Sequence, residues 1–277
     1  MTADSLERRI RETLGFYPSY LSVLEPTPEA AALIWDETER VLAAPWAESR
    51  GEWLGGATAA TIEDSFPATV DTRLDRVIFD EPQLQDTVEF FSFVLLRLGM
   101  GIASCRYALE GESTRHDHRN VVADRKQATT DAPTYWSAGA ATDPPVDPQI
   151  TLVQPEDAPA HVGAAYRYLV DALGTPNVNT IFRAFGSDPA FLTAVVDAQV
   201  DGRFDDAGLG HELRGLYAKA LEADADRESF VTDSIAEADR PAVAEELETF
   251  HDNLATLLVT LYVGTRLVTS GRHRQRA

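Results

Sequence analysis

Cysteine and lysine are scarce in this 277-residue chain, which has one cysteine, Cys105, and two lysines, Lys126 and Lys219. A single cysteine excludes an intrachain disulfide, a CxxC redox motif and a cysteine-rich zinc site. Lys and Arg together number 24 against 45 acidic residues, so the formal charge is −21. Because nucleic-acid binding needs clustered basic side chains, this balance argues against DNA or RNA as a partner.

A long apolar run is also lacking. The most apolar stretch, Phe90 to Cys105, contains Arg97 and falls short of the ~20 residues that span a bilayer. The start of the chain, Met1 to Glu7, has neither the basic nor the apolar part of a signal peptide. We therefore expect a cytoplasmic protein with no membrane partner.

The residues that are present favour a globular core under a charged surface. Hydrophobic residues make up 44% of the chain and charged residues 25%, which is typical of a packed protein. The acidic, alanine-rich, lysine-poor composition resembles that of proteins from extreme halophiles, whose carboxylate surface keeps them dispersed in concentrated salt. We expect the fold to lose stability at low salt through self-repulsion.

Comparison of the chain with itself indicates an internal duplication. Asp80-Glu81-Pro82 and Asp239-Arg240-Pro241 each open a long, apolar helical pattern. Along these patterns Phe90 pairs with Phe250, Leu98 with Leu258 and Arg106 with Arg266, at a constant offset of 160. Amphipathic stretches also precede Leu14-Gly15 and Leu173-Gly174 in matching places.

The duplication predicts an all-α fold of two helical repeats related by a pseudo-two-fold axis. The repeats are residues 5–111 and 161–271, joined by a polar Pro/Asp-rich linker over residues 112–160. Helices that are apolar nearly all round are buried on several sides, so the two long ones should pack together at the centre. The sequence leaves a homodimer open.

Arg106 and Arg266 are the first candidate binding residues, because each occupies the same place near the end of its long helix. A guanidinium there would bind a small carboxylate with two parallel hydrogen bonds. The alternative is a helix-terminal arginine that caps carbonyls or reaches solvent.

Other reactive side chains have simpler readings. Cys105, next to Arg106, is either an activated nucleophile or a small core residue of an apolar helix. His116-Asp117-His118 has the spacing of a metal site but lies in the polar linker. His161, His211 and His251 are isolated, and each is expected to be a surface or helix-cap histidine. The four tryptophans either wall a pocket or, as expected for Trp35, fill the core. We predict no metal and no cofactor.

The stretch from Leu173 to Phe185, with Pro189 and Leu192, is similar to the DehI family of group I 2-haloacid dehalogenases. The weaker match is Leu14 to Trp35, within which Gly15 to Leu21 also resembles the AhpD-like carboxymuconolactone decarboxylases, whose peroxidases need a CxxC that this chain lacks. The dehalogenase resemblance implies an all-α hydrolase with its active site between two repeats.

The same resemblance assigns roles to residues. It implies that Thr180 and Phe182 line the substrate site, whereas the family's catalytic Asp falls on Ile181 and a polar Asn of the first long helix falls near Gly99.

Two hypotheses follow. In the first, the chain is a hydrolase of small 2-halocarboxylic acids with a rearranged site, in which Asp188 or Asp197 is the base and Arg106 or Arg266 holds the carboxylate. In the second, which the isoleucine favours, the fold persists as a non-catalytic binding or interaction protein. Either site should lie near the pseudo-dyad, beneath Thr180 to Phe182.

Overall fold

The computed structural model describes ten stretches of the chain: residues 3–14, 16–18, 21, 28–65, 79, 82–110, 150–175, 177–202, 207–223 and 235–275. Within these stretches the protein is built from helices, with no β-strand, which confirms the all-α prediction. Most of the predicted linker, residues 111–149 with His116 and His118, lies outside the described residues.

The helices follow one another in two series. The first series comprises α1 (Ala3–Leu14), α3 (Pro28–Ala43), α4 (Ala47–Ser65) and α6 (Pro82–Glu110). The second comprises α9 (Ala160–Leu173), α10 (Thr180–Phe185), α11 (Pro189–Gly202), α12 (Ala207–Ala220), the short 3-10 turn η2 (Leu221–Ala223) and α13 (Arg240–Gln275). The two long helices therefore begin where the Asp-X-Pro triplets predicted.

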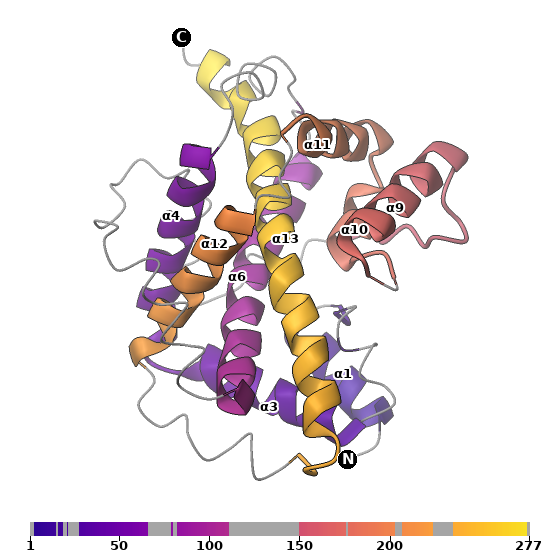
Figure 1. Ribbon diagram of the computed structural model, residues 1–277. Coiled ribbons are helices and arrows are strands. Elements are labelled where there is room, and N and C mark those ends of the chain that lie inside the picture. Colours follow the sequence, from indigo (N-terminus) through magenta and orange to yellow (C-terminus); the bar gives the residue numbers. More distant parts are fainter. Residues whose placement is uncertain are drawn as a thin grey trace.

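The two long helices, α6 and α13, pack against each other in antiparallel directions at the centre of the molecule (Figure 1). Near the start of α6, the Gln85 amide donates to the Val268 carbonyl at 3.4 Å. Near its end, Arg106 contacts His251. Because each end of α6 meets the opposite end of α13, most of the apolar surface of α6 is removed from water.

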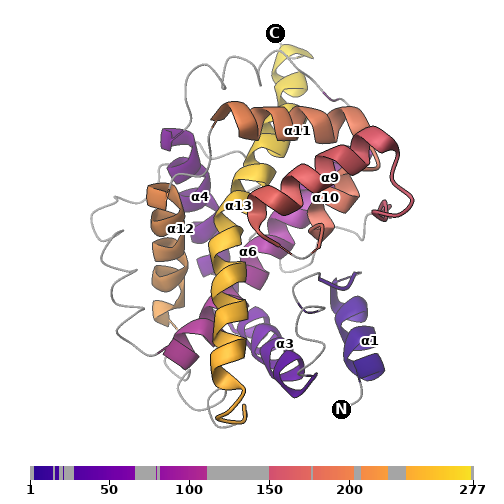
Figure 2. The same ribbon diagram turned by 45° about the vertical axis from the view of Figure 1, so that its right-hand side comes forward.

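The remaining helices surround this central pair. On one side α4 packs on α12, and α3 crosses α6 below them (Figure 1). On the other side α11 lies against α9 and α13, with α10 beneath them (Figure 2). Gly101 of α6 makes the α3 crossing possible, since a Cβ there would lie 2.9 Å from the Thr38 Cα.

The helix order is compatible with the predicted duplication. α4 begins at residue 47 and α12 at residue 207, which is the offset of 160 found along the long helices. Antiparallel packing of α6 on α13 is also what a two-fold axis perpendicular to the pair produces. The superposition of one series on the other, and the repeat boundaries, stay predictions.

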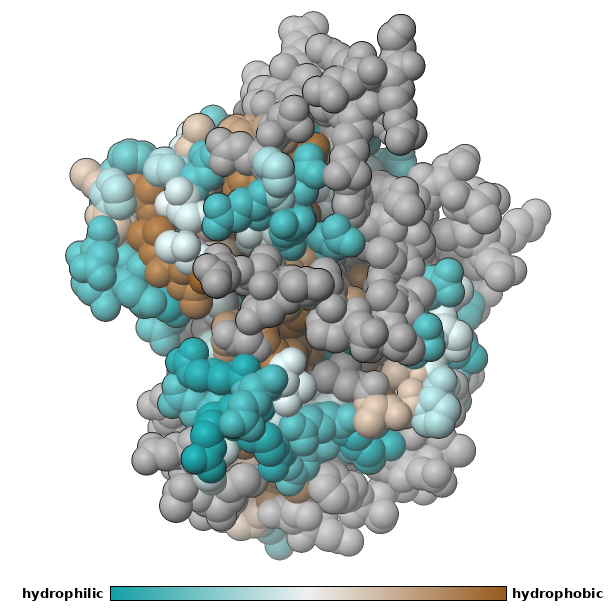
Figure 3. All heavy atoms as spheres, turned by 180° about the vertical axis from the view of Figure 1, so that it is seen from behind, coloured by the Kyte–Doolittle hydropathy of each residue, from teal (hydrophilic) through white to brown (hydrophobic). Residues whose placement is uncertain are grey.

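α6 is long and apolar enough to cross a membrane, judged by length and composition alone. Its most apolar window is 89% buried inside the protein, however, as expected for the core helix of a globular fold. Seen from behind, hydrophilic residues cover much of the described surface, and a hydrophobic band runs along the lobe that holds α9 to α11 (Figure 3).

Candidate functional site

A pocket of about 380 Å³, including the space open to solvent at its mouth, lies between α6 and α13 at the start of α10. The pocket lies between the long helices and beside Thr180 and Ile181, in the region where the sequence predicts a site; that it is the site stays a prediction. Its lining side chains, mostly apolar, are Phe16, Pro18, Phe91, Val94, Leu95, Leu98, Asn179, Thr180, Ile181, Phe250 and Leu257.

The aromatic wall of the pocket is held by ring contacts. Phe91 packs edge-on against Phe90, with ring centroids 5.6 Å apart, and the Phe16 ring lies 5.5 Å from Phe91. Such aromatic pairs add to the energy of area burial and restrict ring motion. The pocket therefore has one firm side contributed by α6 and the segment after α1.

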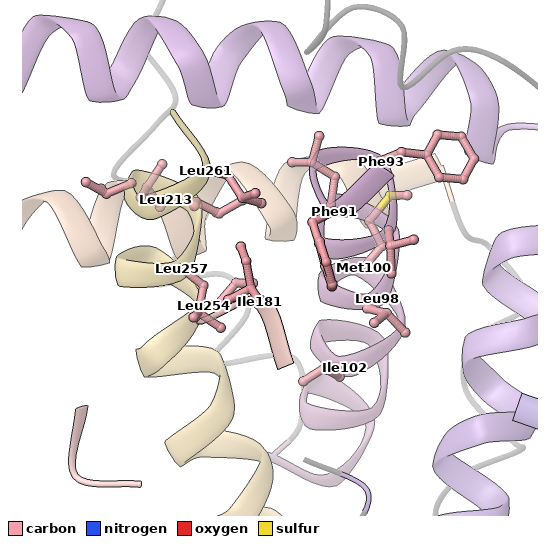
Figure 4. Close-up of a cluster of buried hydrophobic side chains, with 14 of the residues drawn as sticks. Phe91, Phe93, Leu98, Met100, Ile102, Ile181, Leu213, Leu254, Leu257 and Leu261 are labelled. Atoms are coloured by element: carbon pink, nitrogen blue, oxygen red, sulfur yellow. The ribbon is translucent and has the colours of Figure 1, made fainter. Parts of the chain in front are cut away.

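Ile181 stands in the wall at the position where the dehalogenase resemblance implies the catalytic Asp. Its side chain is 4% exposed and lies among leucines of α13 and the apolar face of α6 (Figure 4). An aliphatic side chain neither accepts a proton nor orients water, so this position supplies no base.

The two neighbours of Ile181 differ from each other. Thr180 lines the pocket, as the resemblance implied, and its buried hydroxyl has no hydrogen-bond partner among the described residues. Phe182, by contrast, is fully buried and does not line the pocket. Its role is to pack α10 on the core.

The second family position, Gly99, is covered by the ring of Tyr217 from α12. A Cβ at Gly99 would lie 2.6 Å from the Tyr217 hydroxyl, so the two helices meet through this glycine. Burial raises the pKa of the Tyr217 phenol far above its usual range, which keeps the group protonated. The space above Gly99 is filled by an uncharged ring.

Arg106 is buried and engaged in a network away from the pocket. Its Nε donates to Glu110 at 2.8 Å, and Nη1 donates to His251 Nδ1 at 2.9 Å. A guanidinium has only donors, so His251 accepts at Nδ1 and is neutral, with its proton on Nε2. The prediction of a surface or cap histidine at His251 is wrong, because the residue lies inside α13 and its side chain is fully buried between Tyr107 and Tyr217.

Arg266 also lies outside the pocket lining, and its Nη1 donates to the Tyr262 hydroxyl at 3.4 Å. The predicted pair of carboxylate-binding arginines is therefore not brought together. Arg106 is buried, and its carboxylate partners are Glu110, one turn away on the same helix, and Glu248 of α13 at 3.5 Å.

Neither candidate base reaches the pocket. Asp188 accepts a hydrogen bond from the Phe191 backbone amide at 2.9 Å, which is how an aspartate caps the start of a helix, here α11. Asp197 is exposed on α11. Asp188 thus caps a helix and Asp197 faces solvent, so neither carboxylate lines the candidate site.

The remaining sequence candidates are structural in the described parts of the chain. Cys105 is fully buried, and desolvation together with the nearby Glu37 raises the pKa of its thiol well above the usual range. It is thus a core residue and no nucleophile. Trp35 is buried as predicted and donates to Glu39. No group of three metal-ligating side chains is found among the described residues.

Comparison with known proteins finds likeness in fold. No protein-family model matches the chain, and no curated protein matches it. A solved D-2-haloacid dehalogenase mutant in complex with D-2-CPA superimposes with a TM-score of 0.67 at 14% identity, covering 95% of this chain and 91% of that one. A D-2-haloacid dehalogenase complex with L-LA gives 0.67 at 12% identity, with the same coverage. This chain thus has the all-α fold of the D-2-haloacid dehalogenases.

Proposed function

We propose that this protein binds a small, mostly apolar molecule in the pocket between α6 and α13 and does not hydrolyse it. The observation that carries this proposal is the lining itself. Ile181 occupies the position implied for the base, and none of the described lining residues is ionisable. A site without an acid, a base or a nucleophile retains binding and loses the hydrolytic step.

The fold and the lining of the pocket support a small organic ligand. The similar solved structures hold small carboxylates, 2-chloropropionate and lactate. A pocket with an apolar wall and a few polar groups at one end is the usual form of a small-molecule site. Hydrolysis of 2-haloacids is the competing function, and it requires a base that reaches the bound carbon.

The test measures binding and chemistry in the same sample. The purified chain is incubated with D- and L-2-chloropropionate, and free chloride is measured over time. Binding of 2-methylpropanamide, a four-carbon probe, is followed by saturation-transfer NMR. We expect no chloride above the buffer rate and saturable binding of the amide. Enzyme-dependent release of chloride would contradict the proposal. So would the failure of both 2-methylpropanamide and 2-methylpropanoate to bind at every pH tested.

A matched pair of variants localises the binding. Leu95 and Leu109 are both half-buried leucines of α6, but only Leu95 lines the pocket. We expect Leu95→Trp to abolish binding of the probe, because the indole fills the mouth. Leu109→Trp should bind as the unchanged protein does. Equal binding by both variants would place the ligand elsewhere.

A further inference from the structure

The polar part of the pocket is confined to the start of α10. Asn179 and Thr180 are adjacent in the chain and are the only polar side chains among the described residues of the lining. The opposite wall consists of Phe91, Leu98 and Leu257 from the two long helices. A ligand in this pocket therefore meets hydrogen-bonding groups at one end and hydrocarbon around the rest.

Thr180 lines the pocket, and its buried hydroxyl is unpaired among the described residues. The residue is 4% exposed, and its Oγ1 has no hydrogen-bond partner within the part of the chain that the structure describes. Leaving a buried hydroxyl unpaired costs free energy, which a partner in the pocket would recover. A hydroxyl both donates one hydrogen bond and accepts others, so it can pair with a ligand group that accepts a hydrogen bond or with one that donates.

No positive charge accompanies this hydroxyl in the described lining. Of the predicted candidates, Arg106 contacts Glu110, Glu248 and His251, and Arg266 contacts Tyr262. Arg183, on α10 itself, does not line the pocket and donates to Gln154 at 2.6 Å. A carboxylate brought into an apolar pocket without a counter-charge loses its hydration and gains no ion pair. The formal charge of −21 opposes an anion further.

From these observations we infer that the pocket selects an uncharged head group on a small apolar body. This inference rests on the proposed binding function and specifies its ligand class: a primary amide, an alcohol or a carboxylic acid in its protonated form. A carboxylic acid binds only as the fraction that carries its proton. Its apparent affinity therefore falls about tenfold per pH unit above its own pKa, which lies near 4–5 for a simple carboxyl.

The experiment compares two molecules of the same shape, 2-methylpropanamide and 2-methylpropanoate, by NMR titration of the full chain at pH 5.5, 6.5 and 7.5. The amide affinity should stay constant, which also shows that the pocket is intact across this range. The acid affinity should fall about 100-fold between pH 5.5 and pH 7.5. At pH 7.5 the amide should bind at least 100-fold more tightly than the acid.

Two threonine variants test the contact itself. Thr180 and Thr58 both carry a buried hydroxyl without a partner among the described residues, but Thr58 lies in α4 outside the pocket lining. Thr180→Val should weaken binding of the amide roughly tenfold, the loss of one hydrogen bond. Thr58→Val should leave it unchanged. Neither variant removes a side-chain hydrogen bond among the described residues, so both should melt no lower than the unchanged protein.

The outcomes separate the inference from the proposed function. If 2-methylpropanoate binds at pH 7.5 as tightly as the amide, or its affinity does not change with pH, the inference is wrong while binding stands. If Thr180→Val and Thr58→Val bind the amide equally well, the assigned contact is wrong. If neither molecule binds at any pH, the proposed function fails as well.

Discussion

Two glycines in helix interiors should respond to the same substitution with opposite signs. Gly99 of α6 and Gly56 of α4 each lie within a helix. A Cβ added at Gly56 meets nothing within 4 Å, whereas a Cβ at Gly99 would lie 2.6 Å from Cε1 and the hydroxyl of Tyr217. We therefore compare Gly56→Ala with Gly99→Ala.

The magnitudes follow from two effects. Alanine in place of an interior helix glycine stabilises by about 0.5–1 kcal/mol, because the unfolded chain loses freedom. Gly56→Ala should show this gain in full. At Gly99 the same gain is opposed by overpacking, which costs about 1–3 kcal/mol when neighbours cannot move. The Tyr217 ring is 1% exposed and cannot swing into solvent, so Gly99→Ala should destabilise the fold by up to about 2 kcal/mol.

Urea unfolding of the single and double variants measures both effects. In a Tyr217→Leu background the ring atoms that clash are gone, and Gly99→Ala should become stabilising. The double-mutant cycle should give a coupling free energy of about 1–3 kcal/mol between the two positions. If Gly99→Ala stabilises the unchanged protein as much as Gly56→Ala does, the close approach of α12 to α6 is refuted.

Three further predictions concern charge. Arg106→Met should lower the free energy of unfolding by about 2–3 kcal/mol, because it leaves buried acceptors unpaired. Glu7→Gln, which breaks an exposed ion pair, should cost under about 0.5 kcal/mol. Equal losses for the two variants in chemical denaturation would contradict the buried network. Burial raises the pKa of Tyr166 to about 12 and that of Tyr217 further, so stability should be complete below pH 10 and fall as pH rises toward 12 and beyond. Tyr217→Phe should weaken this alkaline loss, as followed by circular dichroism with phenolate absorbance; an unchanged loss would speak against it. The net charge of −21 predicts a melting temperature that rises from low salt to molar KCl, and a flat one would argue against self-repulsion.

The long helices and the pocket position were predictable because their signals are local and strong. The Asp-X-Pro triplets mark the starts of α6 and α13 within a residue, since proline suits the first turn of a helix. The offset of 160 then pairs the helix centres, Leu98 with Leu258, and the pocket lies beside that crossing. The apolar lining from Phe91 and Leu257 follows from the same pattern.

Partner choices across the fold were not predictable. The sequence of α4 has no strong amphipathic pattern, because its buried residues are mostly small and its apolar face is weak. The packing of α4 on α12 was therefore not predictable. Nor does spacing reveal that Arg106 meets His251, 145 residues away. One signal was available: the offset of 160 pairs His251 with Phe91, a residue of the apolar helix, which favours a buried histidine.

The order in which α6 and α13 leave the ribosome has a consequence for the cell. α6 is complete at residue 110, but the helix that covers it begins at residue 240. At ordinary translation rates this interval lasts roughly 7–26 s. Throughout it, a 29-residue helix apolar enough to enter a bilayer can pack on α3 but not yet on α13. The nascent chain should therefore depend on a chaperone that holds α6, and slow decoding between the two helices should raise aggregation while leaving the finished fold unchanged.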